Sequence, residues 1–251
     1  MHHSVWTLEG HRASWRSERA SGLVDADRPD LGVLDLRVED QTLDRLRFFQ
    51  VGPVHPNEPW QPSELYIRDR DLIATYRETE QRPFSWQIYW RLLAVDDPAI
   101  ILAMELQAAV KTDRLDSRPA LASWTTVESE ESYRQTDPQD KESSGNTEFH
   151  PLPTAAPSFD LGTNDTYFVH RLTQVPYSLI ELFPAGDSSL PQGKSGNGRI
   201  EVRYPLIGSE LEKGVILKAR MRALLVDRDR DLEIAASANR DFRAARLPLT
   251  T

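Results

Sequence analysis

The 251-residue sequence contains no cysteine, which excludes disulfide bonds, thiolate metal sites and cysteine nucleophiles. It also lacks an apolar stretch long enough to cross a bilayer, and no basic segment followed by an apolar run stands at its start. Basic residues are outnumbered, with 30 Lys and Arg against 39 Asp and Glu, and the net charge of -9 disfavours a nucleic-acid partner. We therefore expect a soluble cytoplasmic protein without nucleic-acid or membrane partners.

Motifs for metals, cofactors and common nucleophiles are also missing. No G-x-S-x-G elbow is present, and the histidines beyond the first three residues show no metal-ligand spacing: His11, His55, His150 and His170. The segment Gly193-Lys194-Ser195 is similar to part of a phosphate-binding loop, but Ser188 stands where that motif needs glycine. We expect no metal and no cofactor, and we expect residues 186–198 to form a flexible loop.

The clearest positive pattern is strict alternation between residues 99 and 111. One face there carries only apolar side chains: Ile100, Leu102, Met104, Leu106, Ala108 and Val110. The same phase returns 115 residues later on a second apolar set: Val215, Leu217, Ala219, Met221, Ala223 and Leu225. A period of two predicts a strand with one buried face in each place. Lys218, Arg220 and Arg222 then face outward.

The two strands have similar surroundings, which indicates two related halves. The segment Gln81–Ser85 is similar to Gln174–Ser178, and an apolar strand follows each. Both halves are predicted to be hairpins: Phe84–Leu93 with Ala99–Lys111, and Tyr177–Phe183 followed by Arg199–Leu206 and Val215–Val226. A tandem duplication explains the correspondence, and the alternative is that two antiparallel β segments converge on similar alternation.

The expected fold is mostly β, a large antiparallel β-sandwich-like architecture with two related halves and a short C-terminal helix, Leu232–Arg243. Residues 1–134 form the first half, 135–165 a linker or mobile loop, and 166–251 the second half, in one continuous domain or two. Further strands are expected at Trp6–Trp15, Gly32–Val38, Arg45–Val51, Glu64–Arg68, Leu72–Arg77, Ala120–Glu128 and Thr166–Leu172.

Two outward faces are candidates for ligand binding. In the strand after Pro83, one face carries Phe84, Trp86, Ile88 and Trp90, which are expected in the core rather than as a sugar-stacking platform. The opposite face, with Tyr89 and Arg91, is the better candidate for a ligand. A basic stripe of Lys218, Arg220 and Arg222, with Arg203 and Arg199 on a neighbouring strand, is the second candidate. Its alternative is structural: Glu105 would face Arg220 across a pair of strands.

Two segments, Asp71–Tyr76 and Leu247–Thr251, resemble segments of an uncharacterised planctomycete-type bacterial protein family, and this resemblance implies no activity and no site residues. A duplicated large β body also resembles the sandwich of galactose-mutarotase-like and other carbohydrate-processing proteins, at the level of fold class only.

Three functions remain open. The first is a non-catalytic protein that binds a small polar or anionic ligand or a protein partner, since the sequence offers much strand surface and no recognisable catalytic constellation. The second is a sugar-acting enzyme of the mutarotase-like type, in which His170 and Glu181 would transfer protons. The third is a purely structural protein.

Overall fold

Antiparallel strands make up most of the chain, as the alternating sequence predicts. The structure is a computed structural model that describes residues 5–53, 60–136, 149–153, 155–160, 165–184 and 191–245. Within these residues the one α-helix is α1 (Asp231–Ala244), and two 3₁₀ turns cover Pro29–Leu31 and Arg228–Arg230. None of the described helices is long and apolar enough to cross a membrane.

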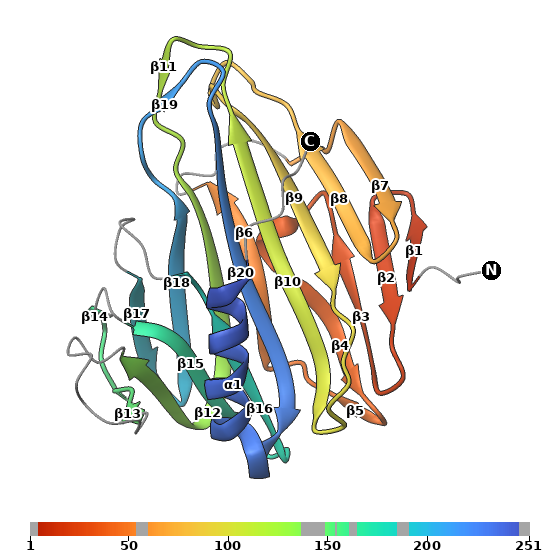
Figure 1. Cartoon of the computed structure of the whole chain (residues 1–251), viewed down its shortest axis with the longest axis vertical. Coiled ribbons are helices and arrows are strands. Elements are labelled where there is room, and N and C mark those ends of the chain that lie inside the picture. Colours follow the sequence, from red (N-terminus) through yellow and green to blue (C-terminus); the bar gives the residue numbers. More distant parts are fainter. Residues whose placement is uncertain are drawn as a thin grey trace.

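The strands form a small sheet, a large sheet and a two-stranded ribbon (Figure 1). The small sheet contains, in spatial order, β1 (Trp6–Glu9), β2 (Arg12–Arg16), β3 (Ala20–Asp25), β4 (Val33–Val38) and β5 (Gln41–Thr42). The large sheet has the order β14 (Phe159–Asp160), β17 (Gln192–Gly196), β18 (Arg199–Ile207), β12 (Leu121–Thr136), β15 (Asp165–Leu172), β16 (Tyr177–Leu182), β20 (Ile216–Asp227), β10 (Ile100–Lys111), β9 (Ser85–Leu92), β8 (Asp71–Tyr76) and β7 (Glu64–Arg68). Two more strands pair with β12, namely β6 (Leu46–Pro53) and β13 (Phe149–Pro151), and the ribbon pairs β11 (Asp116–Ser117) with β19 (Leu211–Glu212).

The long strand β12 joins two parts of the large sheet. Its first half pairs with β6 and β18, and its second half pairs with β13 and β15, with a register shift near Ser129. Side chains of the two parts meet in the interior, where the rings of Phe183 and Tyr204 lie 4.7 Å apart. The two parts therefore face each other as the layers of a sandwich.

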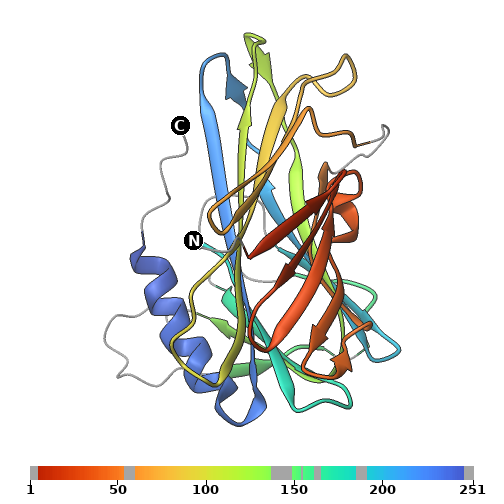
Figure 2. The same cartoon turned by 90° about the vertical axis from the view of Figure 1, so that its right-hand side faces the viewer.

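The five-stranded sheet and α1 lie on opposite sides of the large sheet (Figure 2). Side chains of the five-stranded sheet, such as Trp15 and Val24, share the main core with the inner face of β8, β9 and β10. A smaller core lies under α1, where Ile234 and Phe242 pack over β15, β16 and β20. Both faces of the large sheet are thus covered at α1, which explains why β16 is buried along its whole length.

The two alternating segments that the sequence emphasises form the centre of this sheet. β10 pairs with β20 along its length, with Met104 opposite Ala223 and Leu106 opposite Met221. β9 flanks the pair on one side and β16 on the other, so the order is symmetric about β10 and β20. This symmetry is what a duplication would produce, and common origin of the halves stays a prediction.

Several predicted elements need correction. The predicted strand Trp6–Trp15 is two strands, because the chain turns at Gly10, whose φ of +59 favours glycine. Arg199–Leu206 does not join the second hairpin: β18 pairs with β17 and β12, while β16 pairs directly with β20.

The predicted linker and loop are also partly regular. Within 135–165, β13 and β14 form, and residue 134 lies inside β12. Within 186–198, β17 forms; Lys194 there is paired with Glu201 at 2.9 Å. The structure also describes residues 135–136, 149–153, 155–160 and 165 of the first segment and residues 191 and 197–198 of the second. The remaining residues of both segments, and all of Leu247–Thr251, lie outside the described residues.

Candidate functional site

Five neighbouring strands present a polar surface on the side of the large sheet that faces away from the main core. Register places the outward side chains of β7, β8, β9, β10 and β20 in three cross-strand rows. The rows are Glu64–Thr75–Gln87–Ala109–Lys218, Tyr66–Ile73–Tyr89–Gln107–Arg220 and Arg68–Asp71–Arg91–Glu105–Arg222. We call this surface the polar face. It gathers five of the six binding candidates from the sequence: Tyr89, Arg91, Lys218, Arg220 and Arg222.

Ion pairs occupy one end of the polar face. Arg91 donates two hydrogen bonds of 2.7 Å to the carboxylate of Asp71, and these hydrogen bonds raise the pKa of the Arg91 guanidinium. Arg222 lies 2.9 Å from the carboxylate of Glu105. The carboxylates of Asp71 and Glu105 are almost fully buried, so these side chains hold strands together and their charges are already matched.

Two members of the predicted basic stripe, Arg220 and Arg222, are engaged within the chain. Cross-strand pairing with Glu105 does occur, but the partner is Arg222 and not Arg220, because the register is two residues different from the expected one. Arg220 instead donates to the carbonyl oxygens of Phe242 and Ala245 at the end of α1, and burial lowers its pKa. Arg203 is not next to the stripe: it lies on β18, over the ring of Trp124 at 6.0 Å.

A pocket of about 560 Å³ opens at the other end of the polar face. We call it the sheet-face pocket. Strands β7 to β10, the residue before β7 and the segments after β8 and β10 supply its polar lining: Ser63, Glu64, Thr75, Arg77, Glu78, Ser85, Gln87, Lys111 and Asp113. Ala109 and Ile216 add apolar surface, and Ile216 is 52% exposed. Its volume falls within the range of small-molecule sites.

Gln87 and Thr75 line the sheet-face pocket, and a chain of hydrogen bonds joins them to Tyr89. Tyr89 itself is only 2% exposed and does not line the pocket, so the expectation that it contacts a ligand is not met. The Tyr89 hydroxyl donates to the Gln87 carbonyl oxygen at 2.5 Å, and the Gln87 amide donates to the Thr75 hydroxyl at 2.8 Å. This chain fixes the orientation of the Gln87 amide and leaves lone pairs and one amide hydrogen for a ligand. Three carboxylates and two cations line the walls, so the pocket offers donors and acceptors with nearly balanced charge.

Most candidates from the sequence lie on the same face as the sheet-face pocket, but toward the other end of it, and their role in ligand binding stays a prediction. Gln87 shares its alternation with Tyr89 and Arg91, so this residue was within reach of the pattern. Glu64, Thr75 and Lys111 come from three other strands, and only the strand register brings them to Gln87. No local pattern in the sequence marks those three residues.

His170 and Glu181 do come together, in the interior between the layers. The Nε2 atom of His170 lies 3.3 Å from a carboxylate oxygen of Glu181, and both side chains are fully buried. Thr125 donates to the other carboxylate oxygen at 2.5 Å, and Tyr204 donates at 3.4 Å to the oxygen that lies near His170. Ser132 binds the Nδ1 atom of His170 at 2.8 Å. With no solvent access, neither His170 nor Glu181 touches a substrate in this arrangement, and the pair holds β15, β16, β12 and β18 together.

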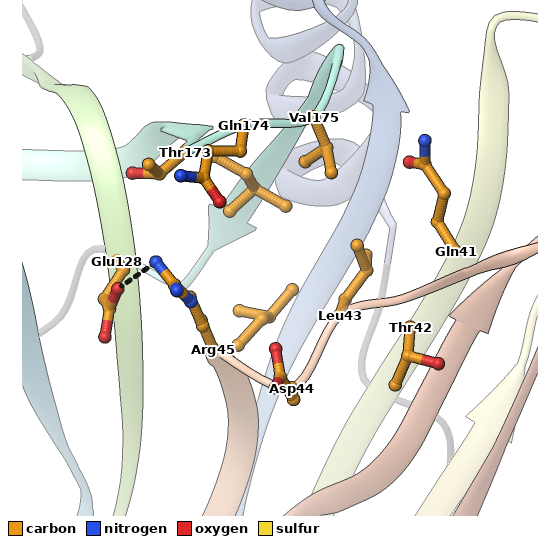
Figure 3. Close-up of a pocket in the computed structure, with 11 residues that line it drawn as sticks. Gln41, Thr42, Leu43, Asp44, Arg45, Glu128, Thr173, Gln174 and Val175 are labelled. Carbon is orange, nitrogen blue, oxygen red and sulfur yellow. Dashed lines mark hydrogen bonds and ion pairs between the residues drawn. The ribbon is translucent and has the colours of Figure 1, made fainter.

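A second pocket, of about 280 Å³, lies between the segment Gln41–Leu46 and the turn that joins β15 to β16 (Figure 3). Leu43, Leu172 and Val175 contribute apolar surface to it, and an ion pair of 3.0 Å joins Arg45 to Glu128 beside it. Both charged side chains are well exposed, so this pair contributes little to stability. No pattern in the sequence predicts this pocket.

The arrangement of strands is similar to that of solved galactose mutarotase-like structures. A galactose mutarotase related enzyme from Lactobacillus acidophilus has a TM-score of 0.54 at 8% identity, over 86% of this chain and 97% of that one. A galactose mutarotase-like protein from Lactobacillus casei has a TM-score of 0.52 at 8% identity, over 84% of this chain and 99% of that one. The chain has the galactose mutarotase-like fold. The sandwich predicted from alternation is thereby confirmed.

A variant of the GH36 alpha-galactosidase AgaA from Geobacillus stearothermophilus also matches, with a TM-score of 0.52 at 10% identity. The match covers 94% of this chain and 43% of that enzyme, so this chain spans less than half of its length. No protein-family model matches the sequence, and no curated protein is significantly similar to it. Identities this low show the fold alone, and function has to be argued from the site.

A metal centre finds no support among the side chains that the structure describes. They contain no group of three or more His, Asp or Glu side chains placed to hold an ion. The side chains of the sheet-face pocket can form hydrogen bonds, and the carboxylates and Lys111 can transfer protons.

Proposed function

We propose that the chain binds a neutral carbohydrate in the sheet-face pocket. The observation that carries this proposal is the oriented pair of Gln87 and Thr75 in the lining of a pocket of about 560 Å³, with the buried Tyr89 hydroxyl holding the Gln87 amide. The fold supports it, because the mutarotase-related neighbours are named for sugar chemistry.

The composition of the pocket favours a neutral ligand over an ion. Sugar hydroxyls donate and accept hydrogen bonds, and they match amide, hydroxyl and carboxylate groups that are already oriented. An anion would meet Glu64, Glu78 and Asp113, and a cation would meet Arg77 and Lys111. The anionic ligand considered from the basic stripe is less suited to this face, because Arg222 is already paired with Glu105.

Titration of monosaccharides into the isotope-labelled full chain, followed by NMR, tests the proposal. We expect saturable shifts of the amides of β8, β9 and β10 with at least one hexose. Gln87→Leu should abolish these shifts, because leucine cannot bridge Tyr89 to Thr75 or donate to the ligand. Glu64→Ala is the safer variant for folding, since Glu64 is exposed on an edge strand, and it should weaken binding.

The matched control is Gln192→Leu, since Gln192 is an exposed glutamine on β17, outside this pocket. It should bind sugar like the unaltered chain. If no hexose shifts β8, β9 and β10, or if Gln87→Leu binds as well as Gln192→Leu, carbohydrate binding in this pocket is excluded. The purely structural function would then be the simplest account.

A second candidate is interconversion of sugar anomers in the same pocket, and the carboxylates and Lys111 in its lining favour it. In that reaction a base removes the proton of the anomeric hydroxyl while an acid protonates the ring oxygen, and the ring opens and closes again. Polarimetry with freshly dissolved α-galactose measures the rate. A rate equal to that of buffer excludes this activity, and Lys111→Ala should slow any rate that is found.

His170→Gln distinguishes the buried pair from the pocket. Because His170 has no solvent access, we expect this variant to change stability and leave any sugar conversion unchanged. A folded His170→Gln variant without conversion would return the proton-transfer role to His170 and Glu181.

A further inference from the structure

The side of the five-stranded sheet that faces away from the core carries a second set of polar side chains in register. Arg16 on β2 lies opposite Ser21 on β3, and Ser21 lies opposite Arg37 on β4. On the same face, Ser14 lies two residues before Arg16 and opposite Thr7 of β1. These residues line a shallow depression of about 690 Å³ in the sheet coloured red and orange in Figure 2.

The two arginines are close enough to bind one group together. Neighbouring strands lie about 4.8 Å apart, so the backbones of Arg16 and Arg37 are roughly 10 Å apart across Ser21. Arginine side chains of ordinary length span half of that separation, and the short Ser21 leaves the space between them open. Asp35 also lines the depression, so its carboxylate and the two guanidinium groups together give a local net charge of one positive unit.

Neither guanidinium group is used inside the described part of the chain. Arg16 and Arg37 make no side-chain hydrogen bond or ion pair there, whereas Arg91 and Arg222 on the polar face are each paired with a carboxylate. Acidic residues exceed basic ones in the whole sequence. Two exposed arginines flanking a small hydroxyl residue therefore present a site of net positive charge on an acidic protein.

We propose that this depression binds an oxyanion, a phosphate or sulfate group, through Arg16 and Arg37. The guanidinium fork matches the oxygen geometry of such groups, and hydrogen bonds between opposite charges are stronger than neutral ones. The hydroxyls of Ser14, Ser21 and Thr7 are the further donors at the site. The oxyanion is either free or an ester on a larger molecule such as a sugar.

The site is independent of the sheet-face pocket, and titrations with three probes keep the two apart. Inorganic phosphate, glucose 6-phosphate and glucose are added separately to the labelled full chain and followed by NMR. We expect phosphate and glucose 6-phosphate to shift the amides of Ser14, Ser21 and Arg37, and glucose to leave them unchanged. Tighter binding of glucose 6-phosphate than of phosphate indicates a sugar ester, and equal binding indicates the free ion.

Two variants and one control test the assignment. Replacing both arginines, Arg16→Ser with Arg37→Ser, should weaken binding at least about tenfold. Ser21→Asp should do the same while keeping both arginines, because its carboxylate would occupy the place of the oxyanion, and its partly exposed position lets the strand fold. Arg114→Ser, at an exposed arginine in the segment after β10, should bind like the unaltered chain.

The proposal is overturned if neither phosphate probe shifts these amides at millimolar concentration. It is equally overturned if Ser21→Asp and the double arginine variant keep full affinity, or if Arg114→Ser loses as much affinity as they do. None of these outcomes bears on sugar binding, which is read from the amides of β8, β9 and β10.

Discussion

Arg220 fastens the end of α1 to the large sheet, and its replacement by methionine should loosen that helix. The guanidinium donates to the carbonyl oxygen of Phe242 and, at 2.6 Å, to that of Ala245. It also lies 4.4 Å from the centre of the Phe242 ring. Methionine keeps much of the packing of the stem but has no donor, so carbonyl groups at the end of the helix lose this partner.

The size of the effect follows from these contacts. A hydrogen bond from a charged donor contributes about 1.5–3 kcal/mol, and a cation over a ring adds roughly 0.5–2 kcal/mol. Burial opposes them: it lowers the pKa of Arg220, which means that the fold penalises the charge, and methionine does not suffer that penalty. We expect the free energy of unfolding to fall by about 2–3 kcal/mol in Arg220→Met.

Urea unfolding and amide hydrogen exchange measure the two consequences. The midpoint of unfolding should fall, and the amides of α1 should exchange faster than those of β10. Arg240→Met is the matched control, because Arg240 is exposed on the same helix, and a change below about 0.5 kcal/mol is expected there. Equal unfolding midpoints for the two variants would refute the role assigned to Arg220.

Three further predictions concern buried polar groups. Glu105→Leu alone should lower the free energy of unfolding by about 3–5 kcal/mol, because it leaves the charge of Arg222 without a partner in a largely buried site. The double variant Glu105→Leu with Arg222→Leu should recover most of this loss in urea unfolding. Losses that simply add would contradict the pairing. Thr125→Val should cost about 1.5–3 kcal/mol by removing a donor to the buried Glu181 carboxylate, with the exposed Thr42→Val as a neutral control in thermal unfolding. Tyr76 donates to the carbonyl oxygen of Ala26 at 2.7 Å, and burial raises its pKa, so its phenol stays neutral in the fold and ionises only on unfolding. Its contribution is therefore complete below about pH 10 and is lost as the pH rises above that value; the alkaline fall in stability should be shallower in Tyr76→Phe, and an unchanged slope would contradict the assignment.

The sequence predicts strands well where packing is decided along a single strand. The alternation at β10 and β20 marks one buried face in each, but Val215, which was expected on that face, precedes β20 and is 42% exposed. The aromatic face of β9 is in the core as expected, with Trp86 and Trp90 almost fully buried. It misses β3, where Gly22 interrupts the pattern of side chains. Glycine is used there because an added Cβ would come within 2.8 Å of the Trp15 ring, a contact between different strands.

The site shows the same limit. Alternation along β9 predicts that Tyr89 and Arg91 point away from the core, and they do. Whether Arg91 is available to a ligand depends on Asp71 and Glu105, which the strand register places opposite it on β8 and β10. Tyr89 is 2% exposed, and the strand alone does not predict this burial. Glu105 pairs with Arg222 rather than Arg220, and the end of α1 lies beside Arg220. Both contacts depend on the three-dimensional path of the chain. No local pattern encodes either one.

The pairing of β10 with β20 also affects how the protein is made. A ribosome synthesises β10 long before β20, although β20 becomes its neighbour from Ile100 to Lys111. During that interval one edge of a twelve-residue, largely apolar strand has no native partner, and such an edge readily pairs with another chain. Aggregation should therefore compete with folding while the polypeptide is still growing. Slower expression at low temperature, or co-production with a chaperone that shields strand edges, should raise the yield of soluble protein more than stabilising the finished fold.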